Sequence, residues 1–78
     1  MFSSMQWNYI QNGFHLTPRQ TEIAKLVCED LNNDQIAKKC RITYNTSRTH
    51  VAHICAKVAV HGRAELIVRL IKVAKHAK

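Results

Sequence analysis

Residues able to bind a polyanion gather in one segment, residues 44–58. If this segment is helical, with 100° between successive residues, its polar side chains share one wide arc. The members of this arc are Asn45, Thr46, Arg48, Thr49, His50, Ala52, His53, Ala56 and Lys57. The arc contains no acidic residue, and the side chains in its middle are small. A helix that enters the major groove of DNA needs this arrangement, because small side chains let the backbone approach the bases and flanking donors reach phosphates and base edges.

The opposite arc of the same segment is suited to a protein core. Its members are Tyr44, Ser47, Val51, Ile54, Cys55 and Val58. They fall within about 100°, which is the ordinary width of a core-facing stripe. Thr43 precedes the segment and is a favoured helix cap. We therefore expect a helix over residues 44–58 with one buried face and one face that reads DNA.

Two capping signals place helices before this segment. Thr17 and Gln20 form a capping box around Pro18, and they predict a helix over residues 18–30. Asn32 and Gln35 repeat the same spacing, which predicts a short helix over residues 33–40. A short connector then leads to the helix over residues 44–58, and this succession is typical of a helix-turn-helix.

The last predicted helix, residues 63–75, is more apolar than one buried face requires. Its apolar members are Ala64, Leu66, Ile67, Val68, Leu70, Ile71, Val73 and Ala74. They spread over about 220° of the helix, whereas packing on a core uses about 100° or somewhat more. The excess predicts a second contact, with the same helix of another copy or with residues 1–15. A symmetric dimer is favoured, because so small a domain has a marginal core.

Residues 1–15 show no clean helical period. We expect a partly ordered amino-terminal arm or a short packing segment, whose aromatic residues cover the core or a neighbouring subunit. Residues 16–78 then form one domain, since 78 residues allow no more than one.

Charge is unevenly distributed along the chain. Residues 38–78 contain ten lysines and arginines against one acid, whereas residues 1–37 contain two against four. A basic half on a small domain attracts nucleic acid or anionic lipid. The last helix lacks Trp or Phe on its apolar side, so packing explains its pattern better than a membrane surface.

Catalysis and metal binding have little support. Cys28, Cys40 and Cys55 form no C-x-x-C pair and sit among apolar residues, so we expect reduced, structural thiols. His50 and His53 share a face, but no carboxylate or cysteine completes a metal site there. No catalytic motif or phosphate-binding loop is present, so we expect no enzyme and no cofactor. No segment has the length of a membrane span or the pattern of a signal peptide, and we expect a cytoplasmic, nucleoid-associated protein.

Together these motifs resemble one known family. The residues that carry the resemblance are 16–23, 33–37, Ile42, Thr43, Thr46, His50, Val51, Ile54, 57–60, Arg63 and Glu65. Residues 16–75 closely resemble the LuxR/GerE-type helix-turn-helix. The resemblance implies an all-α, four-helix DNA-binding domain that acts as a transcription regulator, dimerises through its last helix and binds inverted-repeat sites. Because no sensory or phosphoacceptor segment precedes the motif, the sequence is most similar to the stand-alone members.

The resemblance also assigns roles to residues. The family's base-facing positions fall on Arg48, Thr49 and Ala52, and the expected base readers are Asn45, Arg48, Thr49 and Ala52. The family's backbone-contacting positions include Thr46, His50 and Lys57, and the expected backbone contacts are Arg41, Thr46, His50, His53 and Lys57. The expected dimer contacts are Ile67, Val68, Ile71 and Lys75.

The chain departs from the family pattern at several positions. Asp30 stands where glycine is usual at the end of a helix, and Cys40 and Val58 replace leucines. Ser47 replaces a valine at the contact between helices. Ala52 stands where a polar residue is often found, which removes one base contact.

Two functions follow from these observations. The first is a regulator that binds double-stranded DNA as a homodimer, with RNA polymerase or another regulator as a further partner. The alternative is an interaction protein or inhibitor that pairs with larger LuxR-type regulators through its last helix. The acid-free face over residues 44–58 favours the first, because a pure inhibitor has no reason to keep that face free of acids.

Overall fold

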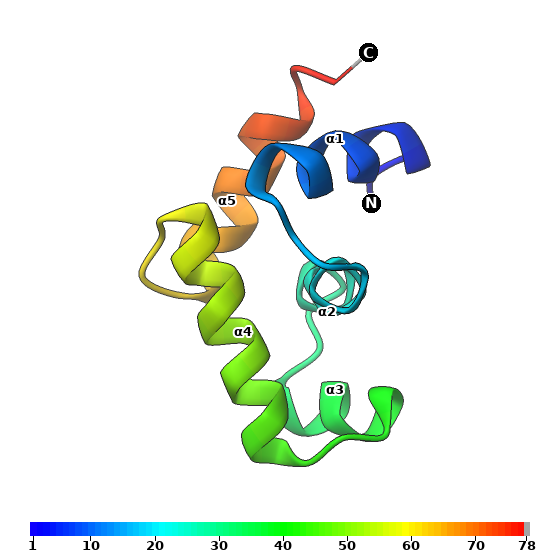
Figure 1. The fold of residues 1–78 in the computed structure, drawn as a ribbon, viewed down its shortest axis with the longest axis vertical. Helices are drawn as coiled ribbons and strands as arrows, with labels where there is room; N and C mark the ends of the chain where they lie inside the picture. Colours follow the sequence, from blue (N-terminus) through cyan, green and yellow to red (C-terminus); the bar gives the residue numbers. More distant parts are fainter. Residues whose placement is uncertain (78) are drawn as a thin grey trace.

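The computed structural model describes residues 1–77 and is helical throughout (Figure 1). The helices are α1 (Ser4–Phe14), α2 (Pro18–Cys28), α3 (Asn33–Cys40), α4 (Tyr44–Val58) and α5 (Arg63–Ala74). The expected all-α class is confirmed. The described residues hold five helices rather than four, because residues 4–14 form a helix that the sequence patterns did not indicate.

The capping signals read from the sequence start the helices as expected. The Thr17 hydroxyl accepts a hydrogen bond from the Gln20 backbone N–H at 3.0 Å, and Gln20 Oε1 accepts from the Thr17 N–H at 3.0 Å. Asn32 and Gln35 repeat this exchange at α3. Thr43 caps α4 by accepting from the backbone N–H of Thr46. These bonds satisfy backbone donors that a helix start otherwise leaves unpaired.

Four helices end at a residue with positive φ, and none of the four residues is glycine. They are His15, Asp30, Arg41 and Ala59, with φ between 56° and 68°. In each case the next residue donates its backbone N–H to a carbonyl five positions earlier, the bond of a Schellman motif. Asp30 thus ends α2 at Cys28, two residues before the predicted boundary.

The expected loose arm is instead α1, a capped helix packed on α5 and α2 (Figure 1). Ser3 and Gln6 form its capping box, and the Gln6 amide donates to the Ala74 carbonyl at 3.3 Å. Trp7 and Ile10 are buried, and the Trp7 ring meets the Phe2 ring and the Lys25 ammonium. The helical pattern of this segment was weak because only Trp7, Ile10 and Phe14 pack inward. Asparagines and Gly13 interrupt the exposed face. Residues 1–15 therefore share one core with the helices that follow.

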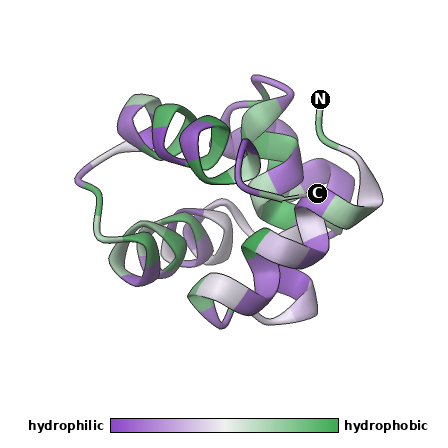
Figure 2. Ribbon diagram, turned by 90° about the horizontal axis from the view of Figure 1, so that it is seen from above, coloured by the Kyte–Doolittle hydropathy of each residue, from purple (hydrophilic) through white to green (hydrophobic). Residues whose placement is uncertain are grey.

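Every helix contributes side chains to this core, and polar and apolar segments alternate along the ribbons, as one-sided burial requires (Figure 2). The fully buried large side chains are Ile10, Ile23, Val27, Ile36, Ile54, Val58, Leu66 and Leu70. Cys28, Cys40 and Cys55 are buried free thiols in the same cluster. The predicted core stripe of α4 is wrong at one position, since Tyr44 is 50% exposed. Tyr44 is the first residue of α4, where the helix borders an open pocket rather than the core.

Candidate nucleic-acid interface

Helices α3 and α4 pack against each other as a helix-turn-helix (Figure 1), and the polar face of α4 is largely exposed. The exposed members of the predicted set are Arg41, Asn45, Thr46, Arg48, Thr49, Ala52, His53 and Lys57. His50 is half-buried. Ser47, Val51, Ile54, Cys55 and Val58 on the other side of α4 are buried. The helix therefore separates its two faces as its sequence pattern indicated.

The four predicted base readers lie together. Asn45, Arg48, Thr49 and Ala52 line one shallow groove of about 280 Å³ on the surface of α4. The Thr49 hydroxyl donates to the Asn45 carbonyl at 2.9 Å, so its methyl group is the part left for apolar contact. The guanidinium of Arg48 has no partner among residues 1–77, and its donors suit the O6 and N7 acceptors of guanine.

Lys57 was expected to contact phosphate, but its ammonium is already bonded within the chain. Its ammonium donates to the His15 carbonyl and to Gln20 Oε1, both at 2.8 Å. These bonds tie the last turn of α4 to the turn between α1 and α2. Two of the three ammonium donors are used internally, which leaves one for a phosphate.

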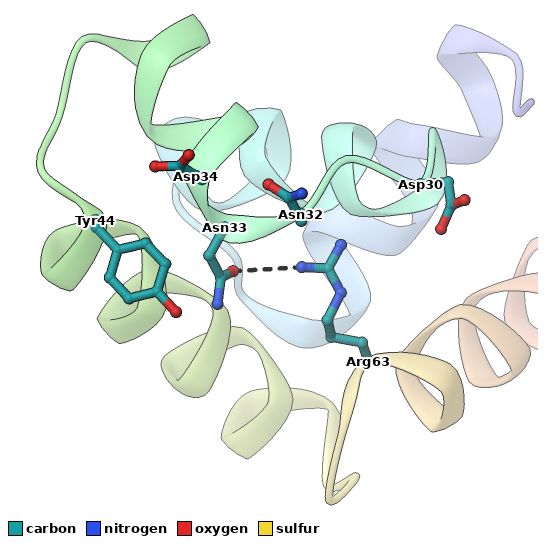
Figure 3. A pocket seen from close by; sticks show the side chains of 6 residues that line it. All are labelled: Asp30, Asn32, Asn33, Asp34, Tyr44 and Arg63. Carbon is teal, nitrogen blue, oxygen red and sulfur yellow. Dashed lines mark hydrogen bonds between the residues drawn. The ribbon is translucent and has the colours of Figure 1, made fainter.

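A second hollow lies beside the first residue of α4. It is a pocket of about 460 Å³ lined by Asp30, Asn32, Asn33, Asp34, Tyr44 and Arg63 (Figure 3). The sequence patterns missed this site because its residues come from three helices and the turn between α2 and α3. Tyr44 in particular fitted the apolar arc, and only its position at the start of α4 hinted at exposure.

Helix α5 carries an apolar surface outside the core. Leu66, Leu70 and Ala74 are buried, while Val68 is 50% and Ile71 is 36% exposed. Of the other predicted dimer contacts, Ile67 is half-buried and Lys75 is exposed. Helix α1 covers the end of α5 at Ala74. Part of the apolar surface that was predicted to need a second contact is therefore covered within the chain, and the part around Val68 and Ile71 stays exposed.

Burial makes two of the three thiols unreactive. Burial raises the pKa of the Cys28 thiol to about 11, and it also raises the pKa of the Cys55 thiol. Thiolates are the reactive form, so both groups are poor nucleophiles near neutral pH. Within residues 1–77 there is no cluster of three or more His, Cys, Asp or Glu side chains placed to hold a metal ion. Nor do these residues include a helix with the length and hydropathy of a membrane span.

Comparison with known proteins agrees with this geometry. The family described as "Bacterial regulatory proteins, luxR family" matches residues 15–70. The nitrate/nitrite response regulator protein NarL of Escherichia coli is 40% identical over 53 residues, which are 68% of this chain and 24% of NarL. The response regulator protein VraR of Staphylococcus aureus is 36% identical over 53 residues, 68% of this chain and 25% of VraR.

The matched region is one part of these larger proteins. The chain spans between 6% and 25% of the length of the curated relatives it matches. No solved structure matches the chain. The family match covers α2, both helices of the helix-turn-helix and α5 as far as Leu70. The chain therefore belongs to the luxR family of bacterial regulatory proteins and carries the helix-turn-helix DNA-binding domain of that family.

Proposed function

We propose that the chain is a transcription regulator that binds a two-fold symmetric DNA site as a homodimer, with α4 in the major groove. The observation that carries the proposal is the open face of α4, which has no acid and a small centre. Ala52 lets the helix backbone approach the bases, and Arg48 and Asn45 supply donors for base edges. The family to which the chain belongs is one of regulators rather than enzymes.

Phosphate contacts surround this reading face. We assign them to Arg41, Thr46, His50, His53 and the remaining N–H of Lys57, which lie on or beside α4. Such contacts fix the register of a protein on DNA without carrying sequence information. A regulator of chromosomal DNA works at the nucleoid in the cytoplasm, and that location is part of the proposal.

Binding to a selected DNA sequence and to random duplex, each across a range of salt, tests the reading role of α4. Arg48→Ala should cost about 1–3 kcal/mol of binding free energy and relax the preference at one base pair. His53→Ala should weaken all sequences to a similar extent, since phosphates are the same everywhere. Arg19→Ala is the control, because Arg19 lies on α2 and pairs with Glu22 at 2.9 Å. Unchanged affinity and preference in Arg48→Ala would refute the assignment.

The proposed dimer uses the open surface of α5, with Val68 and Ile71 at its centre and Ile67 and Lys75 beside them. Two-fold dimers are the commonest oligomers, and a core this small benefits from added buried area. Sedimentation velocity of the wild-type chain and of Val68→Lys tests it. We expect a wild-type dimer, a monomeric variant, and retained binding of the variant to an isolated half-site.

The same surface of α5 is compatible with the alternative function, an inhibitor that pairs with larger luxR-family regulators. A wild-type chain that stays monomeric alone, yet forms mixed dimers with such a regulator and lowers its DNA binding, would favour that alternative. Self-association together with sequence-selective DNA binding would exclude it.

A further inference from the structure

We propose that Asn33 and Tyr44 form a second DNA contact, a pair of neutral hydrogen-bond donors to one backbone phosphate beside the reading face of α4. The inference rests on the proposed DNA-binding function and adds residues that the helix-turn-helix pattern did not indicate. Asn33 is the first residue of α3, and Tyr44 is the first residue of α4.

The two residues lie next to the reading face. Tyr44 precedes Arg48 by four residues, so their side chains are neighbours on the surface of α4. Asn33 and Arg48 line one groove, of about 400 Å³, and Asn33 and Tyr44 line the adjoining pocket. A DNA strand that passes the Arg48 guanidinium therefore comes within reach of Tyr44 and Asn33.

Arg63 fixes the direction in which Asn33 can donate. The Arg63 guanidinium donates from Nη1 to Asn33 Oδ1 at 3.3 Å and from Nη2 to the Leu31 carbonyl. A guanidinium has donors only, so the amide oxygen must face Arg63 and the amide N–H groups must face away. Figure 3 shows the amide nitrogen on the same side as the Tyr44 hydroxyl. Arg63 is thus a positioning residue for a donor that points outward.

The pocket that holds these two neutral donors also holds acids. Asp30 and Asp34 line its walls, and the Asp34 carboxylate lies 3.8 Å from the Lys38 ammonium. These carboxylates disfavour a phosphate close to them, so the proposed phosphate lies between the Tyr44 hydroxyl and the Asn33 amide nitrogen, on the side away from the Asp34 carboxylate (Figure 3). Neither the Tyr44 hydroxyl nor the Asn33 amide nitrogen has a hydrogen-bond partner within residues 1–77, so both remain available to an incoming phosphate oxygen.

Tyr44→Phe tests the contact by removing one hydroxyl. We expect about a threefold to tenfold loss of affinity for specific and random duplex alike, which is the effect of one lost hydrogen bond. The slope of log affinity against log salt should stay unchanged, because a neutral donor releases no counterion. Tyr9→Phe is the matched control, since Tyr9 is similarly exposed but lies on α1. It should bind as the wild type does.

Asn33→Asp tests the donor from Asn33. Aspartate keeps an acceptor for Arg63, so the midpoint of thermal unfolding should not fall, but it presents no N–H to a phosphate. Gln35→Glu adds the same charge two residues further along α3 and remains compatible with its capping box. We expect Asn33→Asp to lower affinity at least about threefold more than Gln35→Glu, the size of one lost hydrogen bond.

DNA affinity in single and double variants tests whether Arg63 positions the Asn33 amide. In a double-mutant cycle, Arg63→Ala should lower DNA affinity in the wild-type background and have no further effect when Asn33 is alanine. Equal effects in both backgrounds would show that Arg63 acts independently of Asn33, and its positioning role would be refuted.

The outcomes separate this contact from the proposed function. If Tyr44→Phe and Asn33→Asp bind as their matched controls do, while Arg48→Ala loses affinity and preference, the contact is refuted and the DNA-reading role of α4 stands. If the wild-type chain binds no duplex at any salt, both are refuted.

Discussion

Replacement of Ser47 by alanine should stabilise the protein. Ser47 is fully buried, and its hydroxyl has no hydrogen-bond partner within the described residues. A buried polar group without a partner costs about 1–3 kcal/mol, and alanine also gains about 0.5 kcal/mol in helix propensity. The lost oxygen leaves a space smaller than a methyl group, with an offsetting cost below about 1 kcal/mol. We expect a net gain of about 0.5–3 kcal/mol in the free energy of unfolding.

Urea and thermal unfolding followed by circular dichroism measure this gain. About 1 kcal/mol corresponds to a rise of about 4–8 °C in Tm for a domain of this size. Thr49→Ala is the matched control on the same helix, because the Thr49 hydroxyl is exposed and already bonded to the Asn45 carbonyl. DNA affinity of Ser47→Ala should match the wild type, since Ser47 faces the core. A Tm at or below that of the wild type would show that the hydroxyl has a partner, and the reasoning would fail.

Three further substitutions or conditions give defined outcomes. Ala59→Gly should raise the free energy of unfolding by about 0.5–1 kcal/mol, because Ala59 has a φ of 63° that glycine adopts without strain. The midpoint of urea unfolding should therefore rise, and a lowered midpoint would contradict this. Gln20→Glu should stabilise by about 0.5–1 kcal/mol, since a carboxylate strengthens the bonds from Thr17 N–H and the Lys57 ammonium; the gain should be smaller in a Lys57→Ala background, where only the bond from Thr17 remains. The Cys28 thiol has its pKa raised from 9.0 to about 11 by burial. The unfolded chain therefore loses this proton first, and stability should fall between pH 9 and 11 more steeply in the wild type than in Cys28→Ala.

The sequence predicted the three central helices well because their signals are local. Capping residues act within one turn, so Thr17, Asn32 and Thr43 mark helix starts without knowledge of the tertiary fold. The two faces of α4 followed from a single period for the same reason. The four predicted base readers share one groove because consecutive turns of a helix align them.

The features that the sequence did not predict depend on contacts between distant segments. Helix α1 is held by Trp7 and by the bond from Gln6 to Ala74, 68 residues away. Tyr44 has the right angle on α4 to be buried, but no helix covers it at that end. The network of Asn33 and Arg63 joins residues 30 positions apart. Periodicity carries no information on such partners.

The internal roles of three cations change the expected electrostatics of DNA binding. Lys57 and Arg69 donate to the backbone carbonyls of His15 and Val58, at the carboxyl ends of α1 and α4, and Arg63 donates to the Leu31 carbonyl in the turn between α2 and α3. Cations favour helix carboxyl ends, so part of the basic excess of residues 38–78 stabilises the fold.

Only some cations of that basic half are therefore free to neutralise phosphates beside the reading face. Among the proposed backbone and base contacts, the arginines and lysines are Arg41, Arg48 and Lys57, and Lys57 has one free donor. Log affinity for random duplex should then fall with log salt with a slope of about −2 to −3 per protomer, at about 0.9 for each neutralised phosphate. Fluorescence anisotropy between low and moderate salt measures this slope. A slope of about −7 per protomer would instead mean that the cations of α3 and α5 also contact DNA, and that the interface extends well beyond α4.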